Sequence, residues 1–164
     1  MVKIMKLGIL VILVAAAFHF NAQAANPFWK QGVTDQRHEI IVYRSESCGC
    51  CKDWIAHLKD HNFDVKDVRV TTVDPYKKNL GVPIEAASCH TAVVDGLVVE
   101  GHVPAQDIKQ LLADGKGDTR ILTVPAMPSG TPGMDMPGAP KRDFRVFAID
   151  KDNEASVYNS YSNY

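Results

Sequence analysis

Residues 39–58 have the sequence EIIVYRSESCGCCKDWIAHL, which contains an apolar strand, a turn with three cysteines and the beginning of an amphipathic helix. Glu39 to Tyr43 is rich in β-branched residues and predicts a buried strand. Residues 52–61 carry apolar side chains at helical spacing, so the cysteines lie at or just before a helix N-terminus. This strand, turn and helix are the first elements of the predicted fold.

The residues that follow predict a mixed α/β domain. Residues 63–70 come close to the alternation of a half-exposed strand, and residues 74–80 predict a short helix. Two apolar runs flank Asp95-Gly96, a strong signal for a hairpin, and a further helix is expected over residues 104–113. This order of elements is the topology of a thioredoxin-like domain. That fold carries a C-x-x-C pattern of active thiols at its first strand-to-helix turn.

The two ends of the chain differ in composition from the middle. Residues 25–37 predict a leader with a helical turn at most. Residues 122–142 are rich in Pro, Gly and Met and leave little room for regular structure, and a final hairpin is expected around the polar turn at residues 150–154. We therefore predict a thioredoxin-like metal-binding domain at residues 25–121. A Met/Pro/Gly-rich segment and C-terminal hairpin at residues 122–164 would pack on this domain.

The first 24 residues have the layout of a secretory signal peptide. Lys3 and Lys6 precede an apolar run at residues 7–18, which is short for a membrane span, and residues 22–24 form a small-x-small cleavage site. An uncleaved N-terminal anchor is the alternative. The prediction is a mature chain that starts near Ala25 and is exported to the periplasm, with no membrane attachment after cleavage.

The charge and length of the chain limit its function. The formal net charge of the 164 residues is −1, and it becomes about −3 once Lys3 and Lys6 are removed. No Lys/Arg-rich run remains, so neither nucleic acid nor an anionic membrane surface is an expected partner. About 140 mature residues are enough for one domain with a hydrophobic core.

The chemistry of the chain is expected at its four cysteines, Cys48, Cys50, Cys51 and Cys89. Three thiols within four residues cannot all pair with one another, so at least one needs another partner. A helix N-terminus favours thiolate over thiol, and thiolates are soft ligands that select copper(I) and also suit zinc. If the fold is thioredoxin-like, Cys89 enters the third strand within bonding reach of the turn, with His90 as a nitrogen ligand nearby.

Two other interpretations of the cysteines stay open at this point. They could form structural disulfides, in which case Cys48–Cys51 with Cys50–Cys89 is the least strained pairing. Cys48 and Cys51 could instead be the dithiol of a thiol–disulfide oxidoreductase. Among metals, zinc is disfavoured because structural zinc sites draw their ligands as spaced pairs, whereas three adjacent thiols suit bridging of several copper(I) ions.

Every methionine of the mature chain lies in one stretch, at Met127, Met134 and Met136. Thioethers bind copper(I) and do not oxidise to disulfides, so these residues are candidate copper ligands, Met134 and Met136 more than Met127. They could equally fill gaps in an apolar core.

The other histidines have weaker claims as metal ligands. His57 and His61 have the i, i+4 spacing of a helical metal site, but both could equally be exposed to solvent. His102, just before the last helix, is expected to be a structural capping residue rather than a ligand. Trp54 is expected in the core.

Several motifs together resemble the CopG-type periplasmic copper-resistance proteins, a metal-binding family. The likeness runs from about Glu39 to Met136 and is carried by the following segments, in order: residues 43–54 (YRSESCGCCKDW), 88–93 (SCHTAV), 100–104 (EGHVP) and 124–134 (VPAMPSGTPGM). The Cys-x-Cys-Cys and Cys-His elements are specific in combination, whereas the Gly/Pro stretch alone would be weak.

The resemblance implies a thioredoxin-like fold that holds a multinuclear copper(I)–thiolate cluster, with a role in copper redox interconversion during resistance. Carried over by position, the four cysteines would be the cluster thiolates, with His90 and the methionines less firmly assigned. The expected function is periplasmic copper(I) binding, with copper oxidoreductase activity as an open question. A thiol–disulfide oxidoreductase and a copper metallochaperone that acts with other periplasmic copper-handling proteins are the alternatives.

Overall fold

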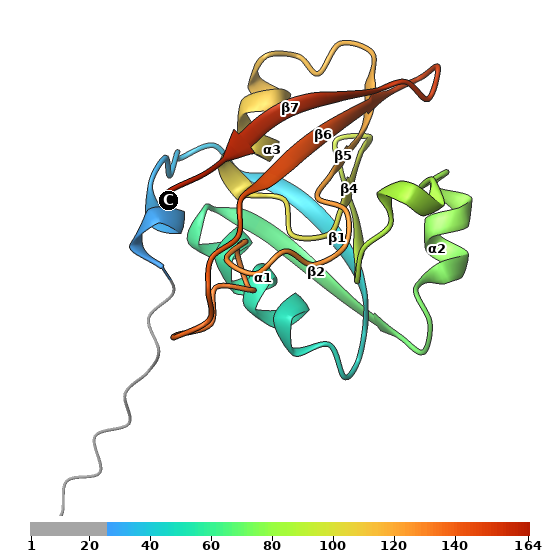
Figure 1. Cartoon of the computed structure of the whole chain (residues 1–164). Coiled ribbons are helices and arrows are strands. Elements are labelled where there is room, and N and C mark those ends of the chain that lie inside the picture. Colours follow the sequence, from blue (N-terminus) through green and yellow to red (C-terminus); the bar gives the residue numbers. More distant parts are fainter. Residues whose placement is uncertain (1–25) are drawn as a thin grey trace, which may run out of the picture.

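The computed structural model describes residues 26–164, so the predicted signal peptide lies outside the described residues. The chain forms a mixed α/β fold around one seven-stranded sheet with the strand order β2-β1-β3-β4-β5-β6-β7 (Figure 1). The strands are β1 (His38–Ser45), β2 (Phe63–Val70), β3 (Thr91–Val94), β4 (Leu97–Glu100), β5 (Thr119–Thr123), β6 (Phe144–Asp150) and β7 (Ala155–Tyr161). The helices are α1 (Gly49–Asp60), α2 (Asp74–Asn79) and α3 (Ala105–Ala113), with 3-10 turns η1 (Pro27–Lys30) and η2 (Ile84–Ala86).

The apolar stretch at the start of the domain forms the buried strand that the sequence predicts. Ile40 and Val42 of β1 are fully buried, and β1 pairs in parallel with β2 and antiparallel with β3. A parallel pair needs a long crossover connection, which α1 supplies. The β3–β4 hairpin turns at Asp95 and Gly96, both at positive φ, as a two-residue primed turn requires.

The two faces of the sheet are covered by different elements. Successive strand residues point to opposite faces, and Val99 and Leu122 belong to the main core with the buried sides of α1 and α3. Their neighbours Val98 and Ile121 belong to a smaller cluster, against which the segment between α2 and β3 packs. The predicted core residue Trp54 is fully buried in the main core. The site is thus built on the N-terminus of a helix that the larger core holds in place.

The C-terminal strands continue the same sheet. The final hairpin, β6–β7, is confirmed, and β6 pairs with β5, which in turn pairs in parallel with β4. The sequence prediction missed β5, which crosses the proposed boundary between residues 121 and 122. This strand has only five residues, and its partners are distant in sequence, so its local pattern is weak. The division of the chain at this boundary stays a prediction.

The mixed α/β class is confirmed, while the finer thioredoxin-like assignment stays a prediction. The leader forms one helical turn, as expected, but its Trp29 is buried in the main core and its indole Nε1–H donates to the carbonyl of Gly130. No helix within residues 26–164 combines the length and the apolar character that a membrane crossing requires.

Candidate metal centre

The cysteine turn lies between β1 and α1, where the sequence predicts a turn between a strand and a helix. Cys48 is the N-cap residue of α1, and Cys50 and Cys51 belong to its first turn. The first backbone N–H groups of a helix lack partners within the helix and give this end a partial positive charge. Cys51 is fully buried, whereas Cys48 and Cys50 are half-buried. The turn thus presents its sulfur atoms in an environment that favours negative charge.

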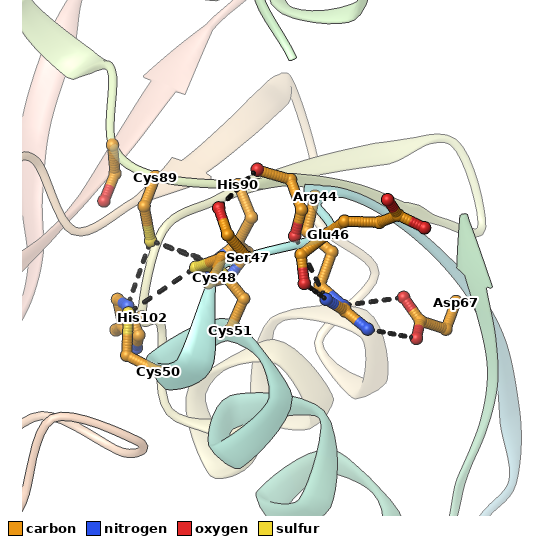
Figure 2. The surroundings of a disulfide bond; sticks show 12 residues. Arg44, Glu46, Ser47, Cys48, Cys50, Cys51, Asp67, Cys89, His90 and His102 are labelled. Atoms are coloured by element: carbon orange, nitrogen blue, oxygen red, sulfur yellow. Dashed lines mark hydrogen bonds and ion pairs between the residues drawn. A yellow bond between two sulfur atoms is a disulfide. The ribbon is translucent and has the colours of Figure 1, made fainter. Parts of the chain in front are cut away.

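An ion pair at the end of β1 holds the chain that leads into this turn. The guanidinium of Arg44 is buried and donates to both carboxylate oxygens of Asp67 on β2, over 2.8 and 2.6 Å (Figure 2). A third nitrogen of the same group donates to the carbonyl of Ser45. A bidentate pair of this kind fixes geometry as well as charge. It therefore fixes the backbone just before Cys48.

The structure brings all four cysteines together. Their Sγ atoms all lie within 4.8 Å of one another, although Cys89 is 38 residues from Cys51 in sequence. Cys89 reaches the cluster because β3 pairs with β1, so the residues before β3 lie beside the end of β1. A group of four sulfur atoms at this spacing can hold metal ions.

Two of these cysteines are joined by a disulfide in the structure. Cys48 and Cys51 are bonded, with their Cα atoms 5.4 Å apart, and Cys50 and Cys89 are free thiols. The Sγ atom of Cys50 lies 3.6 Å from that of Cys48, and the Sγ atom of Cys89 lies 3.7 Å from that of Cys51. The first bond of the two-disulfide alternative is therefore present and the second, Cys50–Cys89, is not.

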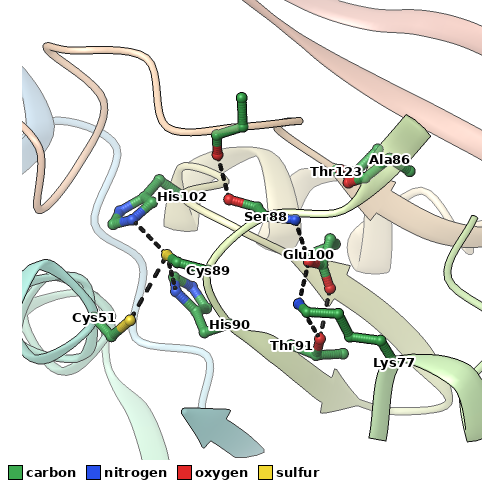
Figure 3. Close-up of polar contacts among 11 residues, drawn as sticks. Cys51, Lys77, Ala86, Ser88, Cys89, His90, Thr91, Glu100, His102 and Thr123 are labelled. Atoms are coloured by element: carbon green, nitrogen blue, oxygen red, sulfur yellow. Dashed lines mark hydrogen bonds and ion pairs between the residues drawn. The ribbon is translucent and has the colours of Figure 1, made fainter. Parts of the chain in front are cut away.

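Two histidines lie next to the sulfur of Cys89 (Figure 3). Nε2 of His102 lies 3.1 Å from the Cys89 sulfur, and Nδ1 of His90 lies 3.2 Å from it. The other ring nitrogen of His102, Nδ1, lies 2.8 Å from the carbonyl oxygen of Pro132. A carbonyl only accepts, so Nδ1 carries the proton and the lone pair of Nε2 faces the sulfur. Metal-bound histidines are commonly oriented in this way.

The second histidine, His90, is fully buried against the first helix. Its ring lies 4.3 Å from the ring of Trp54, centroid to centroid, and its Nε2 has no hydrogen-bond partner within the described part of the chain. Burial lowers the pKa of His90 well below its ordinary value, and the nearby His102 lowers it further. Burial also lowers the pKa of His102. Both rings are therefore neutral at pH 7, which is the form that binds a metal.

The thiol of Cys89 is held in its protonated form when no metal is bound. Burial, and to a smaller extent the neighbouring Cys50, raise its pKa to about 12. The thiolate is the form that binds metals, so a metal must displace this proton. Cys89, His90 and His102 form a second group whose ligand atoms all lie within 4.8 Å of one another. The site thus offers both sulfur and nitrogen donors around one shared cysteine.

The predicted methionine ligands occupy a loop beside the cysteines. Met134 is half-buried, whereas Met127 and Met136 are 51% and 68% exposed. The loop is held against the first turn of α1, since a Cβ atom added to Gly133 would lie 2.7 Å from the carbonyl oxygen of Cys50. Met136 also lines a cavity of about 600 Å³ that reaches Cys50. Copper ligation by the three methionines stays a prediction.

The histidines at i, i+4 on α1 have structural contacts. His57 and His61 are both buried, so the expectation that they could be exposed is wrong. Nε2 of His57 accepts the backbone N–H of Ala105 at the start of α3, and Nε2 of His61 lies 2.7 Å from the carbonyl oxygen of Trp29. Apolar side chains on the same helix face explain this burial, because they draw both rings into the core.

The expected capping role of His102 is also wrong. The N-cap residue of α3 is Pro104, and the side chain that accepts from the first turn of this helix is that of His57. His102 instead faces Cys89. Its position depends on a carbonyl of the C-terminal loop, 30 residues further along the chain. In the sequence, His102 lies in the EGHVP segment that resembles a CopG motif, but no local pattern connects it with Cys89.

Comparisons with known proteins show which family the chain is similar to. The family described as "Protein of unknown function, DUF411" matches residues 86–134, which contain Cys89, His90, His102 and Met134. A comparison with the curated proteins gave no match. Two solved structures are similar, and their descriptions are "Copper resistance protein copG- Form 1" and "Copper resistance protein copG- Form 2".

The similarity to both structures extends over most of the described chain. The first is 44% identical with a TM-score of 0.70, and the match covers 75% of this chain and 96% of that one. The second is 42% identical with a TM-score of 0.73, and the match covers 77% of this chain and 100% of that one. Identity at this level over nearly the whole of both structures shows the family. The chain belongs to the CopG copper-resistance proteins.

Proposed function

We propose that this protein binds copper(I) for copper resistance and holds several ions in a thiolate cluster. The observation that carries the proposal is the convergence of the four sulfur atoms of Cys48, Cys50, Cys51 and Cys89 within 4.8 Å of one another. Soft thiolates select copper(I), and a sulfur atom can bridge two such ions. The copper-resistance description of the two similar structures supports the same metal.

The chemical state of the cysteines determines when copper can bind. All four act as ligands only when the Cys48–Cys51 disulfide is reduced, so copper binding requires the dithiol form. Each thiol that binds must release its proton, and burial opposes this release at Cys89 because it raises the pKa of that thiol to about 12. The neutral rings of His90 and His102 are placed beside the Cys89 sulfur, where they could complete the coordination.

A thioether from the C-terminal loop is proposed as a further ligand. Met134 is the best candidate by position, because it follows Gly133, whose backbone lies against the first turn of α1. Met136 and Met127 are more exposed and would serve for capture of copper rather than for tight binding. Met134→Leu should weaken copper(I) binding more than Met127→Leu does, because leucine keeps the volume but removes the sulfur. Equal affinities in the two variants would rule out ligation by Met134.

Copper stoichiometry tests the proposal. The mature chain is reduced without oxygen, titrated with copper(I) against a chromophoric chelator, and assayed for bound ions and free thiols. More than one tightly bound ion per chain is expected. Cys50→Ser should lower the number bound, whereas Ser47→Ala, a neighbouring exposed position, should leave it unchanged. An unchanged copper content in the Cys50 variant would count against the cluster.

The disulfide favours a second function, reduction of copper(II). In this step the thiolates of Cys48 and Cys51 each give one electron to one copper(II) ion, the two sulfur atoms form a bond, and two copper(I) ions result. Cys50 and Cys89 keep their thiols and remain next to the new disulfide to hold the product. Two equivalents of copper(II) added to the reduced chain should consume two thiols. Unchanged thiols after this addition would exclude the reaction.

Two further functions use the same residues. A thiol–disulfide oxidoreductase would reduce insulin without metal and would tolerate Cys50→Ser, because only Cys48 and Cys51 are needed. A metallochaperone would pass copper directly to another copper-handling protein, at a rate that depends on the acceptor's concentration. Insulin reduction by the metal-free chain would favour the first, and acceptor-dependent transfer would favour the second.

The proposed location is the periplasm. Cleavage after Ala24 would leave Ala25 as the first residue of the exported chain, and export would place the cysteines in an oxidising compartment. Mass measurement of the protein from a periplasmic extract tests this proposal. The mass of the full chain, recovered with membranes, would instead indicate an uncleaved anchor.

A further inference from the structure

The fully buried carboxylate of Glu100 lies next to the segment that carries Cys89. Glu100, the last residue of β4, is completely buried and forms an ion pair with Lys77 of α2 over 2.5 Å (Figure 3). Oε1 of Glu100 also accepts the backbone N–H of Ser88 over 2.6 Å, and Oε2 accepts the hydroxyl of Thr91 over 2.6 Å. The ammonium of Lys77 donates to the same Thr91 hydroxyl. Both carboxylate oxygens of Glu100 therefore have partners.

These partners bracket the metal-site residues in sequence. Ser88 precedes Cys89 by one residue, and Thr91 follows His90 by one. The side chain of Glu100 thus holds the residue on each side of the Cys89-His90 pair, Ser88 through its backbone N–H and Thr91 through its hydroxyl. The chain between these two anchors has only two residues, so movement of either anchor moves the Cys89 sulfur relative to α1.

The backbone next to Glu100 extends the same connection to His102. The N–H of Gly101 donates to the carbonyl of His90, and Gly101 has a φ of +71°. A Cβ atom at this glycine would lie 2.5 Å from Cβ of Ser88, so the two segments are in close contact. His102 follows immediately. One buried carboxylate therefore links the three residues, Cys89, His90 and His102, that form the side of the site opposite the Cys48–Cys51 turn.

We infer that Glu100, paired with Lys77, is a positioning residue that sets Cys89 and its two histidines at bonding distance from the cysteines of α1. The inference deepens the proposed copper function by naming what holds the site together. A buried charge is costly unless it is paired and hydrogen-bonded, and loss of one partner leaves the other uncompensated. A network of this kind specifies one arrangement of the groups it connects.

A metal-free measurement tests the placement directly. In a Cys48→Ser/Cys50→Ser background only Cys51 and Cys89 remain, with sulfur atoms 3.7 Å apart in the native structure. Diamide, an azo oxidant that takes up two electrons and two protons, should join them quickly into a disulfide. Glu100→Gln should slow this step about tenfold or more, since a misplacement of about 1 Å can cost a hundredfold in rate.

Asp107 offers a matched control for loss of a buried carboxylate. Its carboxylate is buried and accepts from Asn159 and Tyr161, in contacts that do not involve the cysteines. Asp107→Asn should lower the free energy of unfolding but leave the rate of Cys51–Cys89 closure unchanged. If Glu100→Gln does not fold, Lys77→Met is used in its place, because it removes the same ion pair from the more exposed side.

The outcomes separate this inference from the proposed function. Slower closure in the Glu100 or Lys77 variant, with normal closure in the Asp107 variant, supports the positioning role, and weaker copper(I) binding in the four-cysteine chain with Glu100→Gln would accompany it. Equal closure rates in all variants would overturn it even if the wild-type chain binds copper. Failure of the wild-type chain to bind copper would reject the proposed function and leave the closure result intact.

Discussion

Nε2 of His102 lies 3.1 Å from the sulfur of Cys89, and the opposite ring nitrogen donates to the carbonyl of Pro132. The C-terminal loop therefore selects the tautomer of a histidine that lies between β4 and α3. This contact makes the Met/Pro/Gly-rich segment part of the candidate metal centre.

The first prediction concerns the ring of His102. His102→Gln should weaken copper(I) binding by about tenfold to a hundredfold, the range found when groups around a metal site are removed. Copper(I) competition with a chromophoric chelator measures the change. His38→Gln is the control, since His38 contacts Asp95 at the other end of β1. Equal affinities in both variants would show that His102 does not bind copper.

A second prediction concerns acid stability. Burial and the neighbouring His61 lower the pKa of His57 from 6.5 to about 3. Between these two pH values the unfolded chain binds a proton at His57 that the folded chain does not. The free energy of unfolding should therefore fall as the pH decreases through this window, by about 1.4 kcal/mol per pH unit from this residue.

Substitution of His57 tests the source of that slope. His57→Gln retains an acceptor for the N–H of Ala105 and removes the titrating group. Denaturant unfolding of this variant should be measured at several pH values between 4 and 7. Its free energy of unfolding should change less steeply with pH than that of the wild-type chain, by about 1.4 kcal/mol per pH unit, which corresponds to about one proton. Identical slopes in the two proteins would assign the acid sensitivity to other groups.

A third prediction concerns the fit of the C-terminal loop against α1. Gly133 has a φ of +81°, and a Cβ atom there would lie 2.6 Å from the backbone nitrogen of Trp54. Gly138 has a φ of +78° but no neighbour within 4 Å of an added Cβ atom. Alanine at Gly138 should cost only the left-handed conformation, about 1–2 kcal/mol, whereas alanine at Gly133 should cost more.

The copper affinities of the two glycine variants extend this test. Gly133→Ala should also weaken copper(I) binding, because it moves the loop that carries Pro132 and Met134 away from the cysteines. Gly138→Ala should bind copper normally. Equal unfolding free energies and equal copper affinities in the two variants would mean that the close contact of Gly133 is unimportant.

Much of the fold could be predicted because its first half follows local rules. The alternation in β1, the helical spacing in α1 and the Asp95-Gly96 turn each depend on residues close in sequence. Strand β5 was missed because its five residues are stabilised by pairing with β4 and β6, which only the folded chain brings together. The burial of Trp29 was missed for the same reason, since its contacts come from distant parts of the chain.

The candidate site divides in a similar way. The convergence of Cys89 with the turn could be predicted, because the expected strand pairing brings the segment before β3 to the end of β1. The place of His102 could not, because it depends on the positive φ of Gly101 and on a hydrogen bond to Pro132. The burial of His57 was missed because the i, i+4 spacing does not show whether that face of the helix is exposed or packed on the core.

The most direct test of the copper–thiolate cluster is X-ray absorption at the copper edge of the reduced, copper(I)-loaded mature chain. Binding to Cys48, Cys50, Cys51 and Cys89 predicts a first shell dominated by sulfur, together with scattering from a neighbouring copper atom. A first shell of nitrogen and oxygen without copper–copper scattering would contradict the account.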